Sequence, residues 1–209
     1  MKGSFYTLGY AGVLGAVCAF LLTAAASFTA PYRATNADAE RKRNILNVLR
    51  VPYLAEVSSQ ELLGIFEASV RQEELNELEL YRYVPPKDSG RDESVAIAFE
   101  GRGLWGPIKG FLALGPDMRT IQGITFYEQE ETPGLGGEIA SDWFRNQFSG
   151  KSIVDQADEP GIIIGAGDGK AAQNQVDAIT GATMTCDKVE AILNSVIKRI
   201  VEENDEDGQ

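Results

Sequence analysis

The sequence predicts an α+β fold: an antiparallel-rich sheet with flanking helices, preceded by one N-terminal transmembrane helix. Residues 3–32 carry no charged side chain. Segments of alternating hydrophobicity, separated by turn residues, follow one another between residues 79 and 128. The apolar residues between 185 and 201 recur with helical period. This order of helices, then strands, then mixed elements favours an α+β fold over a wound parallel sheet.

The N-terminal apolar segment is long enough to cross a membrane. The stretch from Phe5 to Ala30 is apolar or small, and as a helix it can span a hydrocarbon core of about 30 Å. Residues 1–32 are therefore expected to form an anchor that contacts membrane lipid through residues 5–30. A cleaved signal peptide is the alternative, because Ala24 to Ala26 offer a small-residue cleavage site. The length of the stretch favours the anchor.

The remainder of the chain divides into three parts. Residues 33–93 are expected to be a helical and strand lead-in, residues 94–201 the core domain, and residues 202–209 an acidic disordered tail. In the lead-in we expect a helix from Asn36 to Leu49, a second helix that begins with a capping box of Ser58 and Glu61, and a strand from Glu79 to Val84. In the core we expect strands at 94–99, 109–114, 121–128 and 161–165, and helices at 138–148 and 185–201.

Composition excludes several classes of function. The chain has 19 basic and 31 acidic residues and a formal net charge of -12, which argues against nucleic acid as a partner. It has no histidine, the commonest general base and metal ligand, and its two cysteines cannot form a zinc site of the usual kind. Chemistry must therefore come from carboxylates, hydroxyls, the two cysteines or a bound cofactor.

The segment from Asp177 to Thr185 places Thr180-Gly181-Ala182-Thr183 directly ahead of the last helical pattern. Glycine permits a turn that other residues resist, and we expect Thr185 to cap the helix. A hydroxyl at a helix start lies where free backbone N–H groups and the helix dipole favour a phosphate. A capped helix start is the plain interpretation of the four residues alone, and the longer match from Asp177 to Thr185 is more specific.

Two glycine-rich loops are candidates to lie beside a flat ligand. Thr132-Pro133-Gly134-Leu135-Gly136 separates a predicted strand from a predicted helix, and its glycines would let the backbone approach a ring closely. Its spacing is not that of a dinucleotide-binding fingerprint. Gly103-Leu104-Trp105-Gly106 flanks an aromatic side chain with glycines, which would hold Trp105 at a surface. A plain turn and a core Leu-Trp pair are the alternatives.

Together these motifs resemble the covalent FMN-binding subunits of the sodium-pumping NADH:quinone reductase (NqrC) and of the related Rnf complex (RnfG), over roughly residues 94–200. The resemblance implies an FMN-binding domain in which Thr183 carries FMN through a phosphoester. It implies no catalytic acid, base or nucleophile. The further cofactor-binding residues that it implies are Asp177, Thr180, Gly181, Ala182, Thr185, Thr132, Gly134, Leu135, Gly136 and Trp105.

The Gly-Leu-Trp-Gly stretch, followed by Gly110-Phe111, resembles the quinone reductase branch of the family. This implies an electron-transfer subunit of a sodium-translocating NADH:quinone reductase, with other membrane subunits of that complex and a flavin transferase as partners. It also implies a single-pass inner-membrane protein with its domain on the periplasmic side. The charge pattern points the other way, because basic residues including Arg33 and Arg41 follow the anchor and the positive-inside rule would keep them in the cytoplasm.

Several alternatives stay open from the sequence. They are a subunit of the RnfG type, a free-standing covalent flavin carrier, a non-redox binding module and a noncovalent flavoenzyme. Lys151 and Lys170 are candidates to meet a phosphate, although solvated surface lysines are the default. Cys186, at a helix start, is interpreted as a small packed residue, and a reactive thiol of lowered pKa is the alternative.

Overall fold

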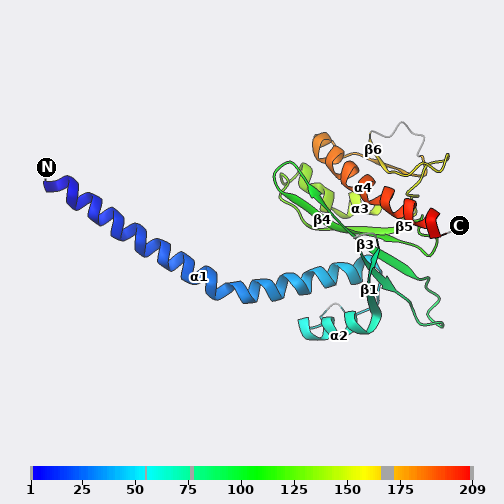
Figure 1. Cartoon of the computed structure of the whole chain (residues 1–209), viewed down its shortest axis with the longest axis horizontal. Helices are drawn as coiled ribbons and strands as arrows, with labels where there is room; N and C mark the ends of the chain where they lie inside the picture. The colour runs from blue at the N-terminus through cyan, green and yellow to red at the C-terminus, as the bar shows by residue number, and fades with distance from the viewer. Residues whose placement is uncertain (1, 55, 76–77, 166–171, 208–209) are drawn as a thin grey trace. The chain divides into compact units, whose positions relative to one another are not determined.

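The computed structural model describes residues 2–54, 56–75, 78–165 and 172–207. The chain separates into two compact units, Met1–Glu40 and Arg41–Gln209. Helix α1 (Lys2–Val48) begins in the first unit and ends in the second (Figure 1). Each unit is considered by itself below.

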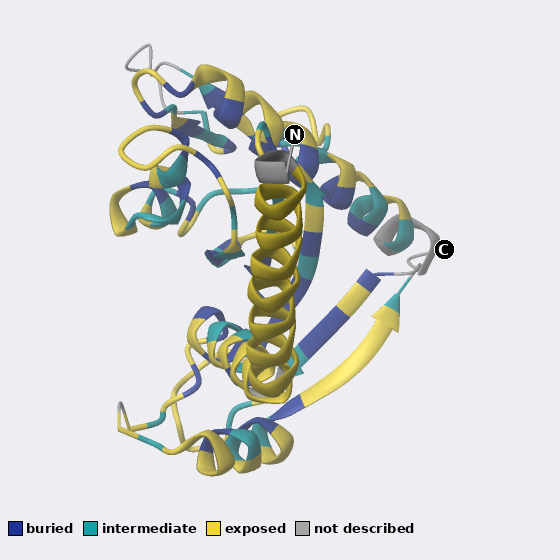
Figure 2. Cartoon of the chain, turned by 90° about the vertical axis from the view of Figure 1, so that its left-hand side faces the viewer, coloured by how far each residue is buried: buried dark blue, intermediate teal, exposed yellow. Residues whose placement is uncertain are grey.

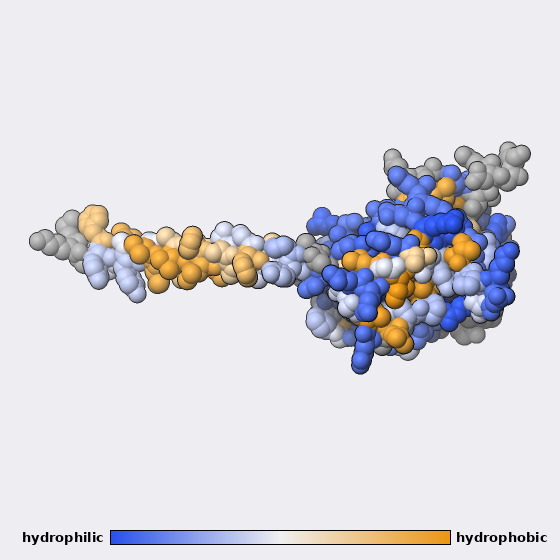
Figure 3. All heavy atoms as spheres, turned by 90° about the horizontal axis from the view of Figure 1, so that it is seen from below, coloured by the Kyte–Doolittle hydropathy of each residue, from blue (hydrophilic) through white to orange (hydrophobic). Residues whose placement is uncertain are grey.

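The first unit consists of the N-terminal part of α1. Among the described residues, one helix is long and apolar enough to cross a membrane, and it is this one. Its large apolar side chains are exposed, with Phe20 and Leu22 each at 72% (Figures 2 and 3). A helix that is apolar all round is stable in an apolar environment, because exposing its side chains to water is unfavourable.

Helix α1 continues without interruption through the position where the sequence predicted a second helix to begin. A separate helix capped at Asn36 was predicted, and this is wrong, since α1 continues through Pro31 and Asn36. Proline removes one backbone donor inside a helix. Side chains form further hydrogen bonds to carbonyls of the preceding turn: Thr29 Oγ1 donates to the Ala25 carbonyl at 2.9 Å, and the Arg33 guanidinium donates to the Ala26 carbonyl at 3.3 Å.

A five-stranded antiparallel sheet is the centre of the second unit, with its strands in the order β1-β2-β3-β4-β5 (Figure 1). Neighbours in the sheet are also neighbours in sequence, so the connections are hairpins. The strands are β1 (Val70–Leu75), β2 (Leu78–Tyr83), β3 (Ser94–Arg102), β4 (Pro107–Leu114) and β5 (Ile121–Glu128). The alternating segments predicted to be strands correspond to β2 through β5, and the bounds of β5 are those predicted.

Strand β1 was not predicted. Its middle residues, Arg71 to Glu74, are charged or polar and exposed, so the strand carries no alternating hydrophobic signal (Figure 2). It forms because Val70 to Leu75 pairs antiparallel with β2 and satisfies the backbone groups of that strand. The preceding helix ends at Ser69, and Val70 begins the strand.

The end of α1 and helix α2 (Ser59–Ser69) cover one face of the sheet. Ser58 and Glu61 form the predicted capping box, in which the Glu61 amide donates to Ser58 Oγ at 3.3 Å. The apolar cluster on this face includes Leu46, Leu62, Phe66, Tyr81 and Phe111.

The other face of the sheet packs against the C-terminal helix α4 (Thr183–Asp207), the 3-10 helix η1 (Gly136–Ala140) and the short helix α3 (Asp142–Asn146). The helical stripe predicted for α4 is buried, since Val189, Leu193 and Ile197 are each 0% exposed. The helix was predicted to end at Val201, ahead of a disordered tail, but it continues to Asp207.

The single helix predicted at 138–148 is instead divided at Ser141. The Ser141 hydroxyl accepts a hydrogen bond from the Phe144 amide at 3.3 Å and starts α3 as its N-cap. Phe144 is fully buried against the sheet, whereas Trp143 is exposed.

A small parallel pair leads into the threonine motif. It consists of β6 (Ile163–Gly165), which was predicted, and β7 (Gln175–Asp177), which was too short to predict. Helix α4 holds this pair: Glu190 accepts from the Ile164 amide at 2.6 Å, and Asn194 accepts from the Ile162 amide at 2.7 Å. Lys170 lies outside the residues that the structure describes.

Candidate functional site

Thr183 is the first residue of helix α4, and its side chain is exposed. Gly181 takes the left-handed φ of +79° that the preceding turn requires. The Cys186 amide donates to the Ala182 carbonyl at 3.0 Å, which closes the first helical turn. The amides of Thr183, Met184 and Thr185 therefore lie in the turn whose donors have no acceptor within the helix. An exposed hydroxyl thus lies at the helix start, in the turn whose amides have no acceptor within the helix.

A hollow of about 330 Å³ opens beside Thr183. Its lining comes from three segments that are distant in sequence: the Gly-Leu-Trp-Gly loop, the glycine-rich loop after β5, and the start of α4. The lining residues are Leu104, Glu131, Thr132, Leu135, Gly136, Gly181, Ala182, Thr183, Met184 and Thr185. The structure therefore brings together the three motifs that the sequence singled out.

Four of the residues predicted to bind the cofactor do not line this hollow. Thr180 and Asp177 are exposed, and the Asp177 amide donates to the Gln147 side chain at 2.8 Å. Gly134 has a φ of +75° and no neighbour within 4 Å of an added Cβ, so its turn explains the glycine. Trp105 is 73% exposed, while its neighbour Leu104 lines the hollow.

Thr185 is not the helix cap that was expected. It lies inside the first turn of α4 and is 2% exposed. Its Oγ1 donates to Glu131 Oε2 at 2.7 Å. The cap prediction is wrong because the helix begins at Thr183, two residues earlier than the apolar pattern indicated, and this turns the Thr185 hydroxyl toward the interior.

Glu131 is the residue at this site that the sequence did not reveal. Its side chain is 4% exposed. Oε1 accepts from the Leu104 amide at 2.8 Å and from the Trp105 amide at 3.4 Å, and Oε2 accepts from Thr185. A buried carboxylate is costly unless it is hydrogen-bonded. These bonds make Glu131 the connection between the three segments, a role that the sequence did not assign to it.

Two glycines make room for the Glu131 carboxylate. A Cβ on Gly136 would lie 2.4 Å from Thr185 Oγ1 and 2.9 Å from Glu131 Oε2. A Cβ on Gly103 would lie 2.5 Å from Glu131 Oε1. These glycines therefore have a packing role in the protein itself, apart from any approach to a ring.

Cys186 is a small packed residue, as the sequence indicated. It is 1% exposed, and burial raises the pKa of its thiol above the usual value. The Ile179 amide donates to Cys186 Sγ at 3.4 Å and partly opposes that shift. The alternative of a reactive thiol with a lowered pKa is excluded in this geometry.

The class of protein follows from the fold and this hollow together with the family comparison. Residues 103–198 match the family described as the FMN-binding domain. This range includes β4, β5, both glycine-rich loops and most of α4. Over this range the chain is similar to FMN-binding domains.

Curated proteins similar in sequence to this chain include subunits of Na(+)-translocating NADH-quinone reductases. The Na(+)-translocating NADH-quinone reductase subunit NqrC of Pasteurella multocida (strain Pm70) is 40% identical over 107 residues, which are 51% of this chain and 41% of that protein. The NqrC of Vibrio alginolyticus is 37% identical over 105 residues, which are 50% and 41% of the two chains. The chain is related to NqrC, and the match spans about two fifths of the length of these relatives.

Solved structures support the same relationship. The NqrC structure from Parabacteroides distasonis ATCC 8503 has a TM-score of 0.65 and 27% identity, and the match covers 81% of this chain and 94% of that chain. The NqrC structure from Shewanella oneidensis has a TM-score of 0.63 at 24% identity, covering 77% and 91%, and shows the shared fold.

Proposed function

We propose that FMN is attached to Thr183 through a phosphoester and that the chain is a membrane-anchored electron-transfer subunit of a sodium-translocating NADH:quinone reductase. The observation that carries this proposal is the position of the Thr183 hydroxyl. It is exposed, it begins a long helix, and it lies on the rim of a hollow built from both glycine-rich loops. An exposed acceptor is needed because a separate transferase must reach it.

The residues at the hollow fit the two ends of FMN. The phosphate would lie at the N-terminus of α4, where the free amides and the helix dipole favour negative charge. The ring would lie against Leu104, Leu135 and Met184, which supply apolar surface. The volume of about 330 Å³ falls within the range of roughly 300–1,000 Å³ that is usual for small-molecule sites. The FMN group supplies redox chemistry, and the protein binds, orients and shields it.

The proposed roles of the other residues follow from their positions. Thr132, Leu135 and Gly136 would contact the ring. Gly181 and Ala182 would shape the turn that presents Thr183. Asp177, outside the hollow, would act only on recognition by the transferase, and Thr180 also lies outside the hollow. Glu131 and Thr185 would hold the loops in place, and Trp105 and Gly134 would border the site.

We propose that the anchor places the domain on the periplasmic side of the inner membrane, beside the other subunits of the complex. The basic residues after the anchor oppose this orientation, but a long domain can translocate despite nearby positive charge. The test is a pair of C-terminal fusions, alkaline phosphatase and green fluorescent protein. An active phosphatase with a dark fluorescent protein is expected, and the reverse pattern would place the domain in the cytoplasm.

The covalent attachment is tested by intact mass after denaturation. The full chain is expressed with a flavin transferase, alongside Thr183→Ala and the matched control Thr180→Ala. We expect the wild type and Thr180→Ala to gain the mass of one FMN less one water, because the hydroxyl at 183 becomes the ester. Thr183→Ala should stay unmodified.

Other outcomes favour the alternatives. A wild-type chain that stays unmodified while the transferase modifies a control acceptor contradicts the covalent proposal. Flavin that is then released on denaturation indicates a noncovalent flavoprotein. A colourless protein with full function after Thr183→Ala indicates a non-redox module. Whether the complex is of the quinone reductase type is tested separately, by purifying the tagged chain from its native membrane and identifying the subunits that accompany it.

A further inference from the structure

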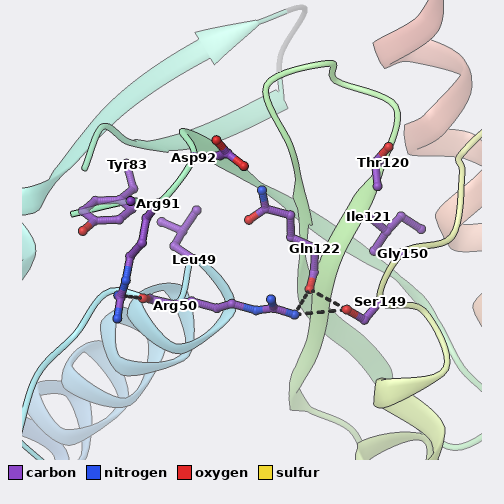
Figure 4. Close-up of a pocket in the computed structure, with 11 residues that line it drawn as sticks. Leu49, Arg50, Tyr83, Arg91, Asp92, Thr120, Ile121, Gln122, Ser149 and Gly150 are labelled. Atoms are coloured by element: carbon purple, nitrogen blue, oxygen red, sulfur yellow. Dashed lines mark hydrogen bonds between the residues drawn. The ribbon is translucent and has the colours of Figure 1, made fainter. Parts of the chain in front are cut away.

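A second cavity, separate in its lining from the hollow at Thr183, surrounds the side chain of Arg50 (Figure 4). It has a volume of about 540 Å³ and lies between the end of α1, the loop before β3 and the start of β5. A neighbouring hollow of about 200 Å³ shares Arg50, Gln122 and Ser149 with it. Arg50 therefore lies between two adjoining spaces.

Arg50 occupies a backbone position that normally favours glycine. Its φ is +54°. The Arg50 amide donates to the Asn47 carbonyl at 3.0 Å and the Val51 amide to the Leu46 carbonyl at 2.9 Å, the pattern of a helix end closed by a left-handed residue. The Arg50 side chain crosses the cavity, where Nη2 donates to the Gln122 carbonyl at 2.6 Å and to Ser149 Oγ at 3.0 Å (Figure 4). These bonds hold the guanidinium in place.

The charged residues that line these two spaces are mainly positive, whereas the chain as a whole is negatively charged. Arg50, Arg91 and Arg145 line the two spaces together with one acidic residue, Asp92, although the chain as a whole has a net charge of -12. Within the described part of the chain, neither Arg50 nor Arg91 forms an ion pair with a carboxylate. Arg145 is paired with Asp142 at 2.5 Å through Nη2. Two of the three guanidiniums are therefore held without a carboxylate from the residues that the structure describes.

Buried polar atoms in the smaller space also lack a partner among the described residues. Thr125 is 4% exposed, and its Oγ1 has no hydrogen-bond partner there. The buried Nε of Arg145 has none either. Both residues line the space next to Arg50. Unpaired buried polar groups cost stability, and a bound ligand is one way to satisfy them.

We propose that the smaller space beside Arg50, lined by Thr125 and Arg145, binds a phosphate group. Guanidinium N–H groups bind phosphate in a fork geometry, and an oxyanion with several oxygens can accept from Arg50, Arg145 and the hydroxyl of Thr125 together. A soluble phosphate ester and a phospholipid headgroup present the same group. The site is distinct from the FMN attachment at Thr183, and it does not depend on that proposal.

The test is thermal unfolding of the full-length Thr183→Ala chain in detergent micelles, followed by tryptophan fluorescence. This background carries no attached FMN, and both tryptophans lie in the second unit. The probes are inorganic phosphate, glycerol 3-phosphate, and micelles containing phosphatidic acid, each against chloride at equal ionic strength. We expect a rise in Tm of about 2–4 °C with at least one probe. A response to the soluble probes indicates a soluble ligand, and a response to phosphatidic acid alone indicates a headgroup.

Three variants locate the effect. Arg50→Gln and Arg145→Gln should abolish the phosphate-dependent rise. Thr125→Val should reduce the rise without lowering the Tm in chloride, because its hydroxyl has no partner to lose among the described residues. As a control, Lys188→Gln makes the same charge change on the exposed surface of α4, away from the cavity, and should keep the full rise. No rise with any probe, or an equal rise in the Arg50 and Arg145 variants, would overturn the proposal.

Discussion

The hydroxyl of Thr185 donates a hydrogen bond of 2.7 Å to the carboxylate of Glu131, residues that lie 54 positions apart in the chain. Both side chains are buried, at 2% and 4% exposure. The second oxygen of the same carboxylate accepts from the Leu104 amide at 2.8 Å. One acidic side chain thus sets the positions of the three segments around Thr183.

Glu131→Gln should destabilise the protein by about 1–3 kcal/mol. The amide can replace only one carboxylate oxygen as an acceptor, so either Thr185 or the Leu104 amide loses its charge-assisted bond. The measurement is urea unfolding of the full chain in micelles, followed by tryptophan fluorescence. Glu130→Gln, on the exposed neighbour, should change stability by less than about 0.5 kcal/mol. Equal effects of the two variants would contradict the role of Glu131.

Thr185→Val tests the other partner in the same bond. Valine preserves the shape of threonine but leaves Glu131 Oε2 without its donor, so we expect a loss of about 1–3 kcal/mol. Thr185→Ser keeps the hydroxyl and should retain the bond, at the smaller cost of one buried methyl group. If serine proves as destabilising as valine in urea unfolding, packing rather than the hydrogen bond is what matters at this position.

Gly136→Ala should disrupt the same contact by steric overlap. The added Cβ would lie 2.4 Å from Thr185 Oγ1, so the loop or the helix must move. We expect a loss of stability of about 1–3 kcal/mol, the usual cost of overpacking. Gly64→Ala is the matched control, because a Cβ there meets nothing within 4 Å inside α2 and should stabilise by about 0.5–1 kcal/mol. A harmless Gly136→Ala would show that the loop is not closely packed.

Tyr81 should make stability depend on pH at alkaline values. Burial raises the pKa of its phenol to about 12, helped by its hydrogen bond of 2.9 Å to Glu79, while the charge of Arg41 opposes the shift. Because the folded pKa is raised, its stabilising contribution is complete below about pH 10 and is lost as pH rises toward about 12. In Tyr81→Phe, unfolding free energy should therefore fall less steeply over that range, and absorbance at 295 nm should lose its latest-titrating component. Parallel curves for the two proteins would refute this assignment.

Cys186 should be inert to thiol reagents in the folded protein. Burial raises its pKa and blocks access, so at pH 8 labelling should proceed only through opened molecules. The experiment uses a Cys18→Ala background and a chromogenic disulfide reagent. We expect slow labelling that becomes fast in denaturant. Immediate labelling of the folded chain would indicate that the start of α4 opens readily.

Local pattern was enough to predict much of this fold. The alternation in strands and the apolar stripe of α4 reflect which side of each element is buried. This pattern can be seen in the residues of the segment itself. The bounds of β5 and the capping box of Ser58 and Glu61 were predicted for this reason. Strands β1 and β7 were missed because β1 is polar and exposed, β7 is short, and both are held by pairing with other strands.

The sequence by itself determined that Thr183 is a candidate acceptor, that the chain has one apolar helix fit for a membrane, and that three motifs resemble a flavin-binding family. These are local properties of composition and spacing. Only the tertiary structure decided that the three motifs share one hollow, that Glu131 ties them together and that Thr185 faces inward. A buried carboxylate and an exposed one look alike in sequence, since what distinguishes them is the set of donors brought to them from distant parts of the chain.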